Sequence, residues 1–339
     1  MNKIKFWVTN ARPISLPQSM LPALTAVALS IGAGSFSVIA AIASVLGVVF
    51  LHFGMNLLDD WYDYRVGSAE ARQAVANEGF RGRMVKYPYL TSGEATPQQL
   101  LKAVLCFMGL AALMGVIVMC MRGWMVLGWM AAGLLIGVSY SGWPLKLGFR
   151  GLGELVIFLM FGPLMMTGVY YAITGTVDLK ITWLSIAVGL LVTNIVYSHS
   201  VLDAIPDQKM GKKTMAHLMG GPKGQIALSA FINTVPYLMI VAAVVIKMLD
   251  VPMAIEGLHW AYLAVLLIFP VSLWLVKSLN EHVTGKETDL EPKKWMGNMG
   301  DWEAYKKAGI AWFLLRWLTA RNIVTRFCII IIVVNFIVG

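Results

Sequence analysis

The stretch AAIASVLGVVFLHFGMNLLDDWYDY, residues 40–64, joins a long apolar run to a cluster of acids. Residues 36–57 contain no charged side chain, and Asp59, Asp60 and Asp63 follow within two helical turns. An uninterrupted apolar run of this kind predicts a helix that spans a membrane. Ionisable residues at the edge of such a span are costly and usually functional. The acids therefore indicate a site at one membrane face.

The composition supports the same class of protein. The chain has 339 residues, of which 58% are hydrophobic and only 13% charged. A soluble domain is about 25% charged, so a soluble protein with one large buried core is disfavoured. The apolar runs are continuous rather than alternating, which excludes a transmembrane barrel. We expect an all-α integral membrane protein formed by one domain over residues 1–339.

Hydropathy predicts about nine transmembrane helices. The predicted spans are 15–34, 36–57, 99–121, 123–141, 152–173, 181–202, 226–248, 257–279 and 323–338. Lysine and arginine are concentrated in alternate loops. By the positive-inside rule, the N-terminus and the acidic loops lie on the cytoplasmic side of a bacterial-type inner membrane. The same rule explains the net charge of +9 without nucleic acid. The short apolar segment 309–319, which contains Arg316, either lies in the interface or extends the last span.

A second acidic cluster lies where the sixth predicted span enters a cytoplasmic loop. It reads HSVLDAIPDQKMGKKT, residues 199–214. His199, Asp203 and Asp207 are spaced i, i+4, i+8, so a helix would present them on one face. Pro206 should break that helix, which puts Asp207 on a turn or a kinked end. In the first cluster, Asn56 shares a stripe with Asp60 and Asp63.

Carboxylates in a row repel one another and need a cation. Solvated helix ends are the simplest alternative, but two such clusters at one membrane face favour Mg²⁺, which takes oxygen ligands and often bridges substrate phosphates. The expected metal ligands are Asp59, Asp60, Asp63, Asp203 and Asp207. Lys212 and Lys213 would take the remaining phosphate oxygens. The chemistry that this arrangement favours is cleavage of a diphosphate ester.

These motifs resemble those of the UbiA superfamily of membrane prenyltransferases. Asp59-Asp60-Trp61-Tyr62-Asp63 is similar to the first family motif, and Asp203-Ala204-Ile205-Pro206-Asp207 with Gly211-Lys212-Lys213-Thr214 is similar to the second. The segments ARPISLPQSMLP, residues 11–22, and GFRGLGELVIFLMFGP, residues 148–163, resemble the subgroup that prenylates 1,4-dihydroxy-2-naphthoate in menaquinone synthesis. The resemblance implies helices arranged around a central cavity, with an active site on the cytoplasmic side. It also implies Mg²⁺, a polyprenyl diphosphate and decarboxylation of the naphthoate to demethylmenaquinone. His199, Ser200 and Leu202 depart from the subgroup pattern.

Further residues are assigned roles on this basis. Asp60, Asp63, Asp203 and Asp207 are the expected catalytic acids, with Tyr140 as an aromatic stabiliser of a carbocation and His199 as a base for the acceptor. The expected diphosphate or acceptor contacts are Arg12, Asn56, Lys146, Lys212, Lys213, Arg81 and Arg83. Tyr140 is equally consistent with an interfacial aromatic, and His199 with a structural hydrogen bond.

Three alternatives stay open. The acceptor could be 4-hydroxybenzoate, homogentisate or glycerol phosphate. A CDP-alcohol phosphatidyltransferase also uses carboxylates and metal, but its acids form one continuous motif. A cation transporter would place its acids nearer the middle of the spans.

Overall fold

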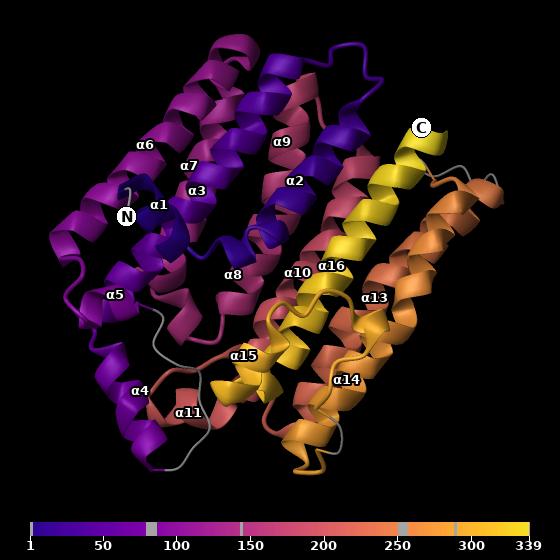
Figure 1. Ribbon diagram of the computed structural model, residues 1–339. Helices are drawn as coiled ribbons and strands as arrows, with labels where there is room; N and C mark the ends of the chain where they lie inside the picture. The colour runs from indigo at the N-terminus through magenta and orange to yellow at the C-terminus, as the bar shows by residue number, and fades with distance from the viewer. Residues whose placement is uncertain (1–2, 79–86, 143–144, 250–256, 288–289, 339) are drawn as a thin grey trace.

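The computed structural model describes residues 3–78, 87–142, 145–249, 257–287 and 290–338. These residues form helices and no strand, with one isolated backbone bridge between Arg150 and Lys213. Long helices run side by side, and short helices gather at one end of the bundle (Figure 1). Two of the predicted diphosphate contacts, Arg81 and Arg83, lie outside the described residues.

Within the described residues, seven helices are long and apolar enough to cross a membrane. They are α3 (Val38–Arg65), α6 (Pro97–Arg122), α8–η3–α9 (Gly153–Thr174), α10 (Leu179–Leu202), α13 (Pro222–Met248), η4–α14 (Trp260–Val283) and α16 (Ala311–Val338). The spans predicted at 15–34 and 123–141 correspond to the shorter helices α2 (Pro17–Ser30) and α7 (Met125–Ser141). The all-α membrane architecture is thus confirmed, whereas the full number of nine spans stays a prediction.

The remaining elements are short. They are α1 (Lys3–Asn10), η1 (Pro13–Ser15), α4 (Ser68–Asn77), α5 (Pro88–Thr91), η2 (Leu147–Phe149), α11 (Ala204–Lys209), α12 (Met215–Leu218), η5 (Lys294–Met296) and α15 (Trp302–Lys307). Figure 1 shows α4, α5, α11 and α15 together at the lower end of the bundle. This end also receives the last turns of α3 and α10, which carry the two acidic clusters.

The last span begins earlier than the predicted residue 323. Helix α16 runs without interruption from Ala311, so the segment 309–319 extends the span rather than forming a separate interfacial helix. Arg316 does not interrupt it because its side chain is buried and paired with Glu287.

Helix α10 lies at the centre of the largest hydrophobic core. It packs so closely on η3 that a Cβ on Gly162 would lie 2.5 Å from the carbonyl oxygen of Ser185 and 2.6 Å from the Cα of Gly189. On another side, the side-chain amides of Asn194 in α10 and Asn233 in α13 exchange two hydrogen bonds, of 2.8 and 2.9 Å. Buried amide pairs of this kind join helices where apolar contact alone is not selective. The end of α10 is therefore rigidly placed.

The two acidic clusters differ in local structure. Helix α3 continues to Arg65, so Asp59, Asp60 and Asp63 all lie on its last turns. Helix α10 ends at Leu202, and Asp203 caps both α10 and the short helix α11. Pro206 falls in the first turn of α11, where its missing N–H costs nothing. The expected helix break is present, but it falls at Asp203, before Pro206. The prediction that Asp207 lies on a turn or a kinked end was therefore wrong, because Pro206 is accommodated in the first turn of α11 and Asp207 follows it in the same short helix.

Candidate active site

The first acidic cluster is organised by a buried carboxylate, Asp60. The Nη2 atom of Arg12 lies 3.0 Å from Asp60 Oδ1 and 3.6 Å from Asp59 Oδ2. The hydroxyl of Tyr89, from α5, donates to Asp60 Oδ2 at 3.0 Å. The hydroxyl of Ser141, at the end of α7, donates to Asp59 Oδ1 at 2.6 Å. Three separate segments of the chain, which carry Arg12, Tyr89 and Ser141, thus contact these two acids on α3.

The ionisation of the groups around Asp60 follows from this contact. Burial lowers the pKa of Arg12, but the charges of Asp60, Asp59 and Asp63 outweigh it, and the net shift is upward. Burial, followed by the charge of Asp60, raises the pKa of Tyr89 well above its usual range. Arg12 therefore stays cationic and Tyr89 stays a hydrogen-bond donor at physiological pH.

Asn56 and His52, both on α3, belong to the hydrogen-bond network that holds Arg12. The Nη2 atom of Arg12 donates to the backbone carbonyl of Asn56 at 2.6 Å. The Asn56 amide in turn donates to the backbone carbonyl of Ala11 at 2.9 Å and to Nε2 of His52 at 3.0 Å. The other ring nitrogen of His52 meets the hydroxyl of Ser19 at 2.8 Å. Asn56 thus contacts Arg12 through its backbone carbonyl and the Ala11 backbone through its amide, and its role toward a substrate stays a prediction.

The second acidic cluster is paired with side chains from α4, from α10 and from the loop after α11. Asp203 is fully buried, 2.9 Å from Nε2 of His199 and 3.8 Å from Nη1 of Arg72. Asp207 lies 3.1 Å from Nζ of Lys212 and 3.9 Å from Nη2 of Arg72. Arg72 belongs to α4, which directly follows the first cluster in sequence. The arginine thus ties the segment after the first cluster to both acids of the second.

The lysine loop after α11 is fixed through its backbone. The Lys213 N–H donates to the carbonyl of Phe149 at 3.1 Å, and the Gly151 N–H donates to the carbonyl of Lys213 at 2.9 Å. The buried carboxyl of Glu154 accepts from the hydroxyl of Ser200 at 2.5 Å and from the N–H of Met215 at 3.3 Å. This arrangement presents Lys212 to Asp207 and leaves the side chain of Lys213 exposed.

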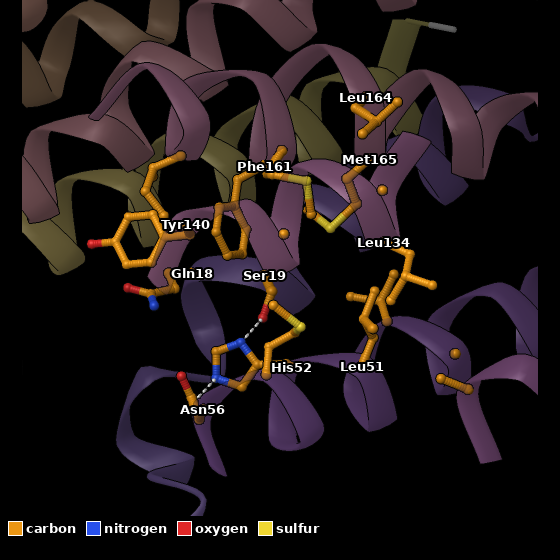
Figure 2. Close-up of a pocket in the computed structure, with 18 of the residues that line it drawn as sticks. Gln18, Ser19, Leu51, His52, Asn56, Leu134, Tyr140, Phe161, Leu164 and Met165 are labelled. Atoms are coloured by element: carbon orange, nitrogen blue, oxygen red, sulfur yellow. Dashed lines mark hydrogen bonds between the residues drawn. The ribbon is translucent and has the colours of Figure 1, made fainter. Parts of the chain in front are cut away.

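A cavity of about 1150 Å³ opens beside the two clusters. Its wall is mostly aliphatic and aromatic, and Asp59 and His199 are among its polar lining residues. Figure 2 shows His52, Ser19 and Asn56 on one wall and Tyr140 with Phe161 across from them. Tyr140 lines the cavity together with Asp59 of the first cluster and with His199, which contacts Asp203 of the second. The clusters therefore lie at the same end of the cavity.

The donors present are suited to Mg²⁺. All are carboxylate oxygens, the ligands that Mg²⁺ prefers. Among the described residues, Asp207 Oδ1 is buried without a hydrogen bond, and no three His, Cys, Asp or Glu side chains converge as a metal site. One or two carboxylates suffice for Mg²⁺ when substrate phosphates and water complete the shell. The residues thus fit a metal that arrives with its substrate.

The structure brings most predicted site residues together in two groups. The first group is Arg12, Asn56, Asp59, Asp60 and Asp63, and the second is His199, Asp203, Asp207 and Lys212. Tyr140 lines the same cavity as Asp59 and His199. Lys146 is half-buried and its ammonium makes no ion pair within the described part of the chain. Lys213 is exposed, and its ammonium makes no ion pair with either group in the part of the chain that the structure describes.

Sequence reasoning missed Arg72, Tyr89 and Glu154. An acid within an apolar run is itself a signal, so Glu154, inside the quoted segment 148–163, could have been found. Arg72 and Tyr89 carry no such signal, because their roles depend on how α4 and α5 fold back.

The long helices, the apolar cavity and the paired carboxylates define an intramembrane enzyme. The UbiA prenyltransferase family matches residues 19–290, so the chain belongs to this family and is a prenyltransferase. This membership disfavours the phosphatidyltransferase and transporter alternatives, and it leaves the identity of the acceptor open.

The chain is also similar to individual prenyltransferases over most of its length. The chain is 27% identical to the 1,4-dihydroxy-2-naphthoate octaprenyltransferase of Bacillus subtilis over 238 residues, which cover 69% of this chain and 72% of that protein. It is 26% identical to the enzyme of the same name from Mycobacterium tuberculosis, over 78% of this chain and 85% of that protein.

Solved structures share the fold. A UbiA homolog from Archaeoglobus fulgidus bound to DMAPP and Mg²⁺ superposes with a TM-score of 0.58 at 16% identity, covering 97% of this chain and 99% of that one. The apo structure of a UbiA homolog from Aeropyrum pernix K1 gives a TM-score of 0.56 at 16% identity, covering 96% and 98%.

Proposed function

We propose that the protein transfers a polyprenyl group from its diphosphate to 1,4-dihydroxy-2-naphthoate in a Mg²⁺-dependent reaction. The observation that carries this proposal is the pair of buried carboxylate clusters at one end of a long apolar cavity. The cavity suits an isoprenoid tail, and the clusters with their lysine and arginine neighbours suit a diphosphate. The names of the relatives supply the choice of acceptor.

The chain's own residues hold the diphosphate. Asp60, Asp63, Asp203 and Asp207 would hold Mg²⁺, which when bound neutralises the diphosphate and favours its departure. Lys212 and Arg72 already lie beside Asp207, and both are placed to turn from the carboxylate to phosphate oxygens. Arg12 pairs with the carboxylate of Asp60 at 3.0 Å. These charges stabilise the negative charge that develops on the leaving pyrophosphate.

The acceptor is aligned at the polar end of the cavity. The bond between the prenyl carbon and the diphosphate oxygen breaks, and the ring carbon that carries the carboxylate forms the new bond. Loss of CO₂ returns the electron pair to the ring, giving the quinol form of demethylmenaquinone. His199 lies 2.9 Å from Asp203 and lines the cavity, so it is placed to accept a phenolic proton as the new bond forms and to return it to the ring oxygen once CO₂ has left. Tyr140 offers its ring face to positive charge on the prenyl carbon.

We also propose the placement of this site in the cell. The concentration of lysine and arginine in the loops around both clusters supports a cytoplasmic site in a bacterial-type inner membrane. Helices α2 and α7 would complete nine spans as part of a single domain over residues 1–339. The bilayer itself would deliver the isoprenoid tail.

A prenyl-transfer assay tests the proposal. Purified protein receives Mg²⁺, a polyprenyl diphosphate and either 1,4-dihydroxy-2-naphthoate or 4-hydroxybenzoate, with the double variant Asp60→Ala/Asp207→Ala as control. We expect a lipid-soluble quinol and CO₂ from the naphthoate alone, and neither in the control. Transfer to hydroxybenzoate alone would overturn the acceptor, and no pyrophosphate release with either acceptor would overturn the function.

A further inference from the structure

Arg316 is a charged side chain buried inside a membrane-spanning helix, and the proposed reaction does not use it. Its side chain is 1% exposed. Its Nε donates to the hydroxyl of Ser278 at 3.0 Å, and its Nη1 donates to the carbonyl of Trp312 at 2.8 Å. Its Nη2 lies 2.9 Å from Oε1 of Glu287. Burying a charged side chain within a membrane span costs free energy, so such a residue usually has a structural or a functional role.

The partners of Arg316 hold the indole of Trp312. The same Glu287 oxygen lies 2.8 Å from Nδ1 of His282. The imidazole of His282 stacks on Trp312 with ring centroids 5.5 Å apart and an interplanar angle of 13°. Arg316, Glu287 and His282, which we call the anchor cluster, therefore fix Trp312 through both its backbone and its ring.

Trp312 in turn leads to the acidic end of the cavity. Its ring meets Phe313 edge-on at 5.8 Å, and Phe313 meets His199 edge-on at 5.2 Å. His199 lies 2.9 Å from Asp203. Trp312 and Phe313 both line the cavity, and both are almost fully buried. A continuous chain of contacts thus connects the anchor cluster to the second acidic cluster.

We propose that Trp312 and Phe313 form an aromatic wall that binds the ring of the acceptor and determines which acceptors are used. The proposal rests on the proposed function, since it needs an aromatic acceptor. Only His199 separates Phe313 of the wall from Asp203. The wall therefore lies at the polar end of the cavity, where the acceptor must meet the reacting carbon. Edge-on and offset aromatic pairs give a planar ring both affinity and orientation. Arg316, Glu287 and His282 act as positioning residues for the wall.

This part of the site is supplied by the C-terminal helix. The family match ends at residue 290, and α16 begins at Ala311. The wall therefore lies outside the segment that carries the family pattern. Acceptor choice is set there independently of the acidic motifs.

Single substitutions in α16 test the wall. Trp312→Leu and Phe313→Leu should each raise the KM for the acceptor about three- to tenfold, the loss of one aromatic pair. The KM for the prenyl diphosphate should stay within about twofold. Phe327→Leu, buried in the same helix but away from the cavity, and Phe336→Leu, an exposed residue of α16, are the matched controls. Both controls should leave the acceptor KM unchanged.

The anchor cluster is tested by Glu287→Gln, which lies outside the spans and keeps the side chain's size. It should raise the acceptor KM in the same direction as Trp312→Leu, with the diphosphate KM unchanged. A purely structural role would lower the fraction of active enzyme and leave both KM values alone.

Several results overturn the inference. A rise in the KM for the diphosphate, a fall in kcat without a change in acceptor KM, or variants that match wild type would each refute the wall while the proposed function stands. Wild-type enzyme that transfers to no aromatic acceptor would refute the proposed function, and the wall with it.

Discussion

The ion pair between Arg12 and Asp60 gives the sharpest stability prediction. We replace Arg12 by Met, which keeps the length of the side chain and removes the charge. Arg12 has a left-handed backbone conformation with φ of 59°, so a glycine would relieve strain and confuse the result. Methionine leaves the backbone preference as it is.

The structure sets the expected magnitude. Asp60 is fully buried, and removing one partner of a buried pair costs about 3–5 kcal/mol. The side chain of Arg12 is 23% exposed, which argues for the lower end, about 3 kcal/mol. The longer contact to Asp59, whose side chain is 20% exposed, adds little. Tyr89→Phe removes one hydrogen bond to the same carboxylate and should cost less, about 1.5–3 kcal/mol.

The assay is reversible unfolding in mixed micelles, read by tryptophan fluorescence, on a double-mutant cycle. Arg12→Met leaves a buried carboxylate without this cation, and Asp60→Asn removes that charge. The double variant Arg12→Met/Asp60→Asn should therefore be more stable than Arg12→Met alone, by at least about 1.5 kcal/mol. A double variant as unstable as the sum of the single variants would refute the ion-pair account of this cluster.

Three further predictions concern other parts of the molecule. Lys212→Ala should weaken inhibition by inorganic pyrophosphate at least about tenfold, whereas Lys213→Ala, an exposed neighbour, should change it less than twofold. The pKa of Glu287 is lowered from 4.5, because its hydrogen bond with His282 and the charge of Arg316 outweigh burial. Its stabilisation is thus present above pH 4.5 and lost as the pH falls through the folded value, so the gap in Tm between wild type and Glu287→Gln should close in acid. Gly162→Ala places a methyl 2.5 Å from a carbonyl oxygen of α10 and should cost about 2 kcal/mol, whereas Gly34→Ala, which meets open space, should not.

Local pattern was sufficient for the spans and for the acidic clusters. Apolar runs set seven long helices, and the helical spacing of Asp59, Asp60 and Asp63 put them on the last turns of one helix. Pro206 indicated a helix break in the second cluster, and α10 does end at Leu202, but Pro206 and Asp207 share the short helix α11. These features depend on residues close in sequence, which is why the sequence predicts them.

Features that depend on tertiary contacts were not predictable. The sequence placed the last span at 323–338 and left open whether segment 309–319 extends it, because Arg316 reads as an exposed charge until its pairing with Glu287 is known; the structure shows one helix from Ala311. Arg72 reaches both acids of the second cluster only because α4 folds across it. The aromatic wall follows from the packing of α16 and has no sequence motif.

Binding of a prenyl thiodiphosphate, an analogue that does not ionise readily, tests the central claim most directly. Calorimetric titrations would compare wild type with Asp207→Asn, each with Mg²⁺ and with EDTA. The account predicts tight binding by wild type only in the presence of Mg²⁺, and binding weakened at least about tenfold in the variant. Binding that is equally tight in EDTA, or that is unchanged in Asp207→Asn, would contradict the assignment of the two carboxylate clusters to a metal-bound diphosphate.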